Sequence, residues 1–198
     1  MITFQTLWDN HPGSGSKPCD EYFENQCAIR MSISLQGSGV SLKTFRGAKC
    51  WYKNDKKHPK DTKIKHVLRA RELADWLKSK GTIGTYKRYI RSKHELEYGT
   101  LDHTAFQEFK GIVFINNGWG NTDHIDVWDG KDMKGGDIEY FTRGDEVWFW
   151  EMERVPVVAP IEEEITLPAI EITPSNRRRN LYDSIMEDVE EVLDRIFG

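Results

Sequence analysis

The sequence predicts an α+β fold in which helices come first and an antiparallel sheet follows. Two observations predict this order. Apolar residues recur at helical spacing before about residue 80, whereas short β-branched and aromatic runs separated by turn residues follow residue 110. With 198 residues, of which 38% are hydrophobic, the chain can bury one sizeable core and carry an appendage.

The first predicted helix follows a loop. Residues 8–16 are rich in glycine, serine and proline, which is typical of turns. From Asn25, which can cap a helix, Cys27 and the apolar residues after it recur at helical spacing until Gly37. Cys27 is therefore expected in the first turn of a helix.

A second helix is predicted over residues 62–80, with Gly81 as its stop. The expected buried side consists of Ile64, Val67, Leu68, Leu73, Trp76 and Leu77. Residues 82–108 carry mixed signals and are given no assignment.

Four strands are predicted after residue 110, forming an antiparallel meander: residues 111–116, 124–128, 138–142 and 146–151. Turn residues separate them, notably Asp129-Gly130 and the stretch 143–145.

The chain is divided into a domain over residues 1–154 and an appendage over residues 155–198. The appendage begins with a linker rich in proline and glutamate and ends in an amphipathic helix over about 175–197. Its apolar stripe is Leu181, Ile185, Val189, Val192 and Ile196. We expect this stripe to pack on the first domain or on a second copy of the chain, which would give a homodimer.

Charge is unevenly distributed, with basic residues crowded between 43 and 93 and acidic residues dominant after 123. The net charge of -4 does not itself indicate a nucleic acid. A non-enzymatic alternative remains, in which this basic stretch binds nucleic acid with the aromatic residues Trp51, Tyr52, Tyr86 and Tyr89. Neither an apolar run of membrane-spanning length nor a Sec signal is visible, so we expect no membrane span and synthesis in the cytoplasm.

Cys27 and His124 carry the chemistry that the sequence suggests. A cysteine in the first turn of a helix lies where backbone N–H groups and the helix dipole favour the reactive thiolate. A helix-borne cysteine followed much later by a strand-borne histidine is the chain order of papain-like enzymes. Strand alternation places Asp126 and Trp128 on the face of His124. The other histidines are interpreted as surface or core residues, and no Cys or His spacing suggests a metal site.

Several segments together resemble the fourth family of type VI secretion amidase effectors, which are related to NlpC-type peptidases. The matching segments are Trp8, 10–12, 25–32, 69–70, 73–77, 111–114, 118–119, 124–130 and 147–150. The resemblance spans about residues 8–152. The appendage has no counterpart in that family.

The resemblance implies a papain-like cysteine amidase without a cofactor. Its substrate would be the peptidoglycan stem peptide, cut at the amide between D-glutamate and meso-diaminopimelate. The type VI secretion apparatus would deliver it into the periplasm of target bacteria, and a cognate immunity protein would protect the producer. A cysteine peptidase of the same fold with another substrate is the nearer alternative.

Carried over residue by residue, the resemblance makes Cys27 the nucleophile and His124 the base. Asp137 is the first choice for the third catalytic residue, with Asp126 and Asp129 as alternatives. Asp126 is in addition assigned to substrate binding or orientation, together with Asn25, Gln26 and Trp119. Because a periplasmic destination and an odd cysteine count leave Cys27 as the free thiol, we expect Cys19 and Cys50 to form a disulfide or to lie close enough to form one in a periplasm.

Overall fold

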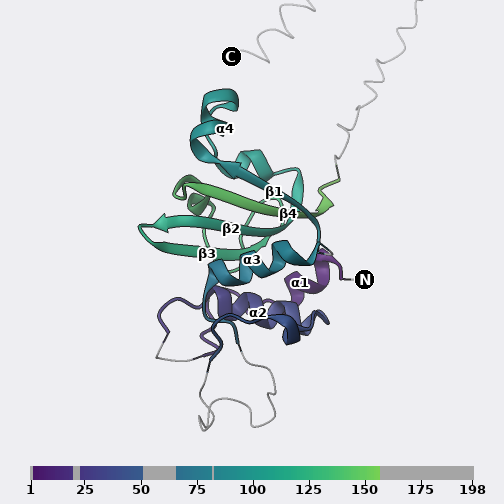
Figure 1. Cartoon of the computed structure of the whole chain (residues 1–198). Coiled ribbons are helices and arrows are strands. Elements are labelled where there is room, and N and C mark those ends of the chain that lie inside the picture. Colours follow the sequence, from purple (N-terminus) through teal and green to yellow (C-terminus); the bar gives the residue numbers. More distant parts are fainter. Residues whose placement is uncertain (1, 20–22, 51–65, 82, 157–198) are drawn as a thin grey trace, which may run out of the picture. The chain divides into compact units, whose positions relative to one another are not determined.

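A computed structural model describes residues 2–19, 23–50, 66–81 and 83–156 (Figure 1). Three helices cover one face of a four-stranded antiparallel sheet, as the predicted fold class requires: α1 (Phe4–Asn10), α2 (Cys27–Gly37) and α3 (Ala70–Lys80). The predicted appendage lies outside the described residues from residue 157 onward, so its linker, its helix and the homodimer stay predictions.

The helix α1 occupies part of a stretch predicted as loop, and that prediction is wrong for residues 8–10. A capping box starts it: the Thr3 hydroxyl accepts a hydrogen bond from the Thr6 amide, and the Thr6 hydroxyl accepts one from the Thr3 amide. Phe4 and Leu7 bury one side of this short helix. Two apolar residues are too few to give a clear periodic signal.

The helix α2 confirms the first predicted helix, with Cys27 as its first residue. Its N-cap is Gln26 instead of Asn25, and no side chain caps its first turn. Ser34 fixes it to α1 by donating a hydrogen bond from its hydroxyl to the Leu7 carbonyl, at 2.5 Å.

The helix α3 is shorter than predicted, because it begins at Ala70 and not at Thr62. Val67 instead forms an antiparallel bridge with Lys49. Residues 62–65 lie outside the described residues. The predicted end is confirmed: Gly81 adopts a left-handed conformation, with φ of 62°, that glycine tolerates best.

The sheet consists of β1 (Thr85–Ile90), β2 (Phe109–Trp119), β3 (Thr122–Trp128) and β4 (Glu146–Arg154). Its order is β1-β4-β2-β3, so β4 lies between β1 and β2 and the sheet is not a simple meander. The unassigned stretch supplies β1 and the helix α4 (Arg91–Tyr98), which has no buried residue. The edge strand β3 lies beside α2 and α3 (Figure 1).

The predicted strand over residues 138–142 is wrong, since Ile138–Thr142 forms a 3₁₀ helix, η3. Asp137 starts it by accepting a hydrogen bond from the Glu139 amide at 2.9 Å. Two more 3₁₀ turns, η1 (Leu42–Thr44) and η2 (His103–Phe106), lie in connections between elements.

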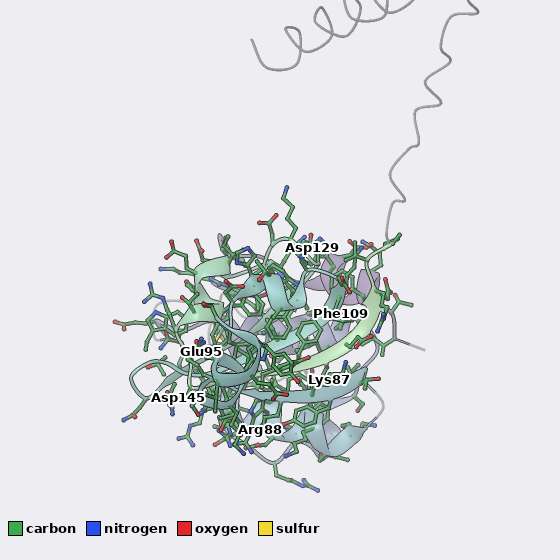
Figure 2. The ribbon with its side chains drawn as sticks, turned by 90° about the horizontal axis from the view of Figure 1, so that it is seen from above. Lys87, Arg88, Glu95, Phe109, Asp129 and Asp145 are labelled. Atoms are coloured by element: carbon green, nitrogen blue, oxygen red, sulfur yellow. The ribbon has the colours of Figure 1, made fainter. Side chains whose placement is uncertain are left out.

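Apolar residues bury both faces of the sheet. Ile125 and Val127 pack toward the helices, whereas Trp128 lies on the opposite face in a second cluster with Phe106 and Phe141. The Trp128 indole N–H donates a hydrogen bond to the Phe106 carbonyl at 2.9 Å. At the margin of this second face, the Lys87 amine lies 5.3 Å from the centre of the Phe109 ring; both residues are labelled in Figure 2.

None of the helices in the described part of the chain has the length and apolar character that a membrane span needs.

Candidate active site

A cleft of about 360 Å³ lies where the start of α2 meets the edge strand β3. Five residues predicted for the site line it together: Asn25, Gln26, Cys27, Trp119 and His124. The remaining lining residues are Glu24, Arg30, Thr122, Asp123, Gly135 and Tyr140.

Cys27 and His124 face the same cleft, and each shifts the pKa of the other. Burial alone would raise the pKa of the Cys27 thiol. The pKa is lowered instead, because hydrogen bonding to His124, the charge of His124 and the backbone N–H groups of Ile125 and Ala28 together outweigh burial. The sulfur also lies 3.8 Å from the Asp123 carbonyl oxygen. The site therefore favours the thiolate, which is the nucleophilic form.

His124 is poised to carry the matching positive charge. Burial would lower its pKa, but hydrogen bonds with Asp126 and Cys27 and the charges of both groups raise it to about 9. The lowered pKa of Cys27 and the raised pKa of His124 both favour a thiolate–imidazolium pair.

Asp126 is the carboxylate that holds His124. Its Oδ2 lies 3.1 Å from His124 Nε2, and the residue is only 1% exposed. The backbone amides of Gly135 and Val127 also donate hydrogen bonds to this carboxylate, at 3.0 Å and 2.8 Å. This contact at Nε2 leaves Nδ1 of the imidazole available to another partner.

The two other candidates for the third residue, Asp137 and Asp129, take part in local turns. Asp137 is exposed, and its carboxylate caps η3 instead of facing His124. Asp129, the other alternative, accepts hydrogen bonds from the amides of Lys131 and Asp132 within its turn, at 2.8 Å and 2.7 Å. The strand predicted over residues 138–142 does not form, and of the three candidates Asp126 is the one that contacts His124.

His11 is a site residue that the sequence interpretation missed. Its Nε2 lies 3.5 Å from Asp126 Oδ1, and its Nδ1 accepts a hydrogen bond from the Gly13 amide at 3.2 Å. Burial is the main reason that the pKa of His11 falls to about 4, and it outweighs the negative charge of Asp126, which raises this pKa. His11 is therefore neutral at pH 7. Its place in the matched segment 10–12 was the only sign of this role in the sequence.

Two glycines allow the loop after β3 to pack against this network. A Cβ atom on Gly136 would lie 2.8 Å from His124 Nε2 and 3.0 Å from the Tyr140 ring. A Cβ atom on Gly135 would lie 3.0 Å from His11. Both positions therefore require glycine, because neighbouring side chains lie too close to the backbone to leave room for a Cβ atom.

Aromatic rings form the wall beside His124. Trp119 and Tyr140 meet edge to face with ring centres 4.5 Å apart, and the Tyr140 and His124 ring centres are 4.9 Å apart. This wall restricts the imidazole from turning and shields it from water on that side.

Arg30 and Gln26 shape the cleft through contacts with the backbone. Arg30 donates hydrogen bonds to the carbonyls of Ser16 and Ser14, at 2.8 Å and 2.9 Å. The Gln26 amide donates to the Phe23 carbonyl at 2.7 Å and its oxygen accepts from the Cys19 amide at 3.3 Å. Gln26 thus orients the segment before Cys27, whereas Asn25 is exposed at the cleft.

Cys19 and Cys50 lie together, and neither lines the cleft. Their sulfurs and a ring nitrogen of His66 all lie within 4.8 Å of one another. The disulfide between them stays a prediction.

The aromatic residues of the nucleic-acid alternative are used for packing where they are described. Tyr86 meets Trp148 edge to face at 5.8 Å, and Tyr89 meets Phe106 at 5.0 Å between ring centres. Trp51 and Tyr52 lie outside the described residues. Tyr86 and Tyr89 therefore do not provide exposed faces on which bases could stack.

The family model described as type VI secretion system amidase effector protein 4 (Tae4) matches residues 23–150. A comparison with curated protein sequences found no match. Among solved structures, the type VI effector–immunity complex Tae4–Tai4 from Salmonella Typhimurium is similar, with a TM-score of 0.56 and 19% identity over 77% of this chain and 99% of that chain. The Tae4–Tai4 complex from Enterobacter cloacae gives a TM-score of 0.55 and 16% identity over 77% and 99% of the two chains.

Proposed function

Because the chain belongs to the Tae4 family of type VI secretion amidase effectors, and is thus a hydrolase, we propose that it acts as a cysteine amidase with Cys27 as nucleophile. The observation that carries this proposal is the shared cleft of Cys27 and His124, with a buried carboxylate on the second ring nitrogen of the histidine. This arrangement meets the geometric requirements of a nucleophile, a base and an orienting group.

The residues support an acyl-transfer reaction in two halves. The Cys27 thiolate attacks the amide carbonyl, and the oxygen becomes an oxyanion near the N–H groups at the start of α2. The His124 imidazolium then gives its proton to the departing amine, which leaves a thioester on Cys27. Neutral His124 next removes a proton from water, the hydroxide attacks the thioester, and the released thiolate restores the pair.

Asp126 has the role of a positioning residue in this reaction. It holds the imidazole through Nε2 and stabilises the positive charge that forms on the ring. His11, which is neutral and buried against the other oxygen, keeps that carboxylate in place without competing for charge.

For the substrate, we propose the peptidoglycan stem peptide, cut between D-glutamate and meso-diaminopimelate. Membership of the family supports an antibacterial amidase. The choice of the amide between D-glutamate and meso-diaminopimelate is a further, more specific part of the proposal. Action in the periplasm of target bacteria follows from that substrate. A cognate immunity protein is proposed from the similar solved complexes, in which Tae4 effectors are bound to Tai4 immunity proteins.

Digestion of purified muropeptides, followed by mass spectrometry, tests reaction, bond and nucleophile together. We expect the full chain to release a fragment with meso-diaminopimelate at its new amino terminus, and Cys27→Ala to release none. Cleavage at a different amide would refute the bond and keep the cysteine amidase. Cleavage by Cys27→Ala at the wild-type rate would refute the mechanism.

A further inference from the structure

A second cluster of reactive side chains lies on the far side of the catalytic cysteine's helix and is not used in the proposed reaction. It consists of Cys19, Cys50 and His66, which are 2%, 7% and 6% exposed. The two cysteines pack against Ile29 of α2. None of the three lines the cleft.

The backbone brings these residues together from three distant parts of the sequence. Cys50 and His66 flank the bridge between Lys49 and Val67, and the Cys50 amide donates a hydrogen bond to the His66 carbonyl at 2.9 Å. The His66 amide in turn donates to the Cys50 sulfur at 3.3 Å. The Cys19 sulfur lies 2.7 Å from His66 Nδ1.

Two thiolates and an imidazole are the donor set that zinc prefers in proteins. On one tetrahedral zinc ion, bonds of about 2.3 Å to sulfur and 2.0–2.1 Å to nitrogen place neighbouring ligand atoms roughly 3.5–3.8 Å apart. The three atoms here all lie within 4.8 Å, so small side-chain movements would suffice. The backbone N–H on the Cys50 sulfur is the kind of outer contact that orients a metal ligand.

We propose that Cys19, Cys50 and His66 bind one divalent transition-metal ion of the zinc class. The described residues supply three ligands, and water or a further ligand fills the fourth position. Sequence spacing gave no sign of this site, because its ligands lie 31 and 16 positions apart, as their numbers show, instead of in a short CxxC motif.

The role of the ion is structural, since it would tie together two segments that hold α2. The Cys19 amide donates a hydrogen bond to Gln26, the N-cap of α2, at 3.3 Å. The Val67 amide donates to the Ser32 hydroxyl, within α2, at 3.1 Å. An ion bound at the cluster would therefore hold the approach to Cys27 against the bridge formed by Lys49 and Val67.

Metal content of the full chain tests the proposal. The protein is purified reduced and without a polyhistidine tag, loaded with zinc chloride and exchanged into metal-free buffer. We expect about one zinc ion per chain in the wild type and in the control Cys27→Ser, and at least about a fivefold lower content in Cys19→Ser and Cys50→Ser. Cobalt(II) in place of zinc should give thiolate charge-transfer absorption that the same two variants lose.

Thiol counting on the wild type keeps the test independent of whether variants fold. With zinc bound, an alkylating reagent should modify one of the three cysteines, Cys27, and a chelator should expose the other two. Equal zinc content in Cys50→Ser and the wild type would overturn the proposal. So would a reduced wild type that takes up no zinc, including a protein isolated with a Cys19–Cys50 disulfide that stays metal-free after reduction.

Discussion

Two cysteine–histidine pairs of the described residues, Cys27 with His124 and Cys19 with His66, differ in their surroundings, and those of the first pair suit catalysis. Cys27 is the first residue of α2 and lines the cleft with His124, whose second nitrogen faces Asp126. Cys19 and His66 are buried outside the cleft. Their neighbour is a second cysteine, Cys50, whereas the neighbour of His124 is the carboxylate of Asp126. A short distance between a cysteine sulfur and an imidazole is thus not enough to indicate catalysis. The substrate must also reach the sulfur, and a carboxylate must orient the imidazole.

The strongest test of this contrast exchanges one cysteine at a time for serine. We expect Cys27→Ser to lower kcat/KM on muropeptides by at least about 10⁴-fold, because the thiolate is the attacking group. The matched control, Cys19→Ser, should stay within about tenfold of the wild type, since it touches only the second cluster. If Cys19→Ser were inactive but folded while Cys27→Ser kept its activity, the two assignments would have to be exchanged.

Asp126→Asn probes the group that distinguishes the catalytic pair. We expect a loss of about 10³-fold, since the amide can no longer stabilise the imidazolium. The pKa of His124, about 9 in the intact site, should fall without the carboxylate. The alkaline limb of the pH profile of kcat/KM should therefore move to lower pH.

Asp137→Asn is the control for this prediction, because it keeps the carboxylate of Asp126 and changes only the cap of η3. It should leave the pH profile unchanged. A larger loss in Asp137→Asn than in Asp126→Asn would restore Asp137 as the orienting acid.

Gly136→Ala tests how tightly the loop after β3 holds the catalytic histidine. The added methyl group would lie 2.8 Å from His124 Nε2, so the ring must shift and kcat should fall by about a hundredfold. Gly15→Ala is the matched control, because nothing lies within 4 Å of its added methyl group. Equal activity of the two variants would show that the loop does not constrain His124.

The smallest expected effect concerns stability and comes from His11. The pKa of His11 is about 4 in the folded protein and 6.5 in the unfolded chain. Between pH 6.5 and pH 4 the unfolded chain therefore binds more protons than the folded protein, and the free energy of unfolding decreases as pH falls. Over the 1.5 pH units from 6.5 to 5, this contribution amounts to about 2 kcal/mol. The raised pKa of His124 has the opposite sense and acts only above pH 6.5.

Urea unfolding at pH 7 and pH 5 measures this contribution. We expect the loss of stability between the two pH values to be smaller in His11→Gln than in the wild type. An identical loss in both proteins would show that His11 does not titrate in this way.

The two regions also differ in how well the sequence predicted them. Cys27 and His124 were found because helical and alternating periods fix which face a residue takes, and matched motifs contained both. The helix α2 and the strands β2, β3 and β4 followed from the same periods. The strand predicted after Asp137 does not form, because that aspartate caps the 3₁₀ helix η3 instead.

Contacts between distant segments were beyond the reach of local patterns. His11 meets Asp126 only because α1, α2 and the loop after β3 converge. The order β1-β4-β2-β3 likewise depends on tertiary pairing, which no single strand encodes. The cluster of Cys19, Cys50 and His66 is assembled by the bridge between Lys49 and Val67, where a helix had been expected.

The strand β3 alternates between residues at the cleft and residues in the core, which limits how its length can vary. His124 and Asp126 serve the site, while Ile125 and Val127 pack beneath the helices. Substitutions on one side of the strand leave the other side in place. A single inserted or deleted residue within β3 would instead exchange the two sets, placing isoleucine and valine in the cleft and two ionisable groups in the core. Length variation among related chains should therefore be confined to the turns on either side of this strand.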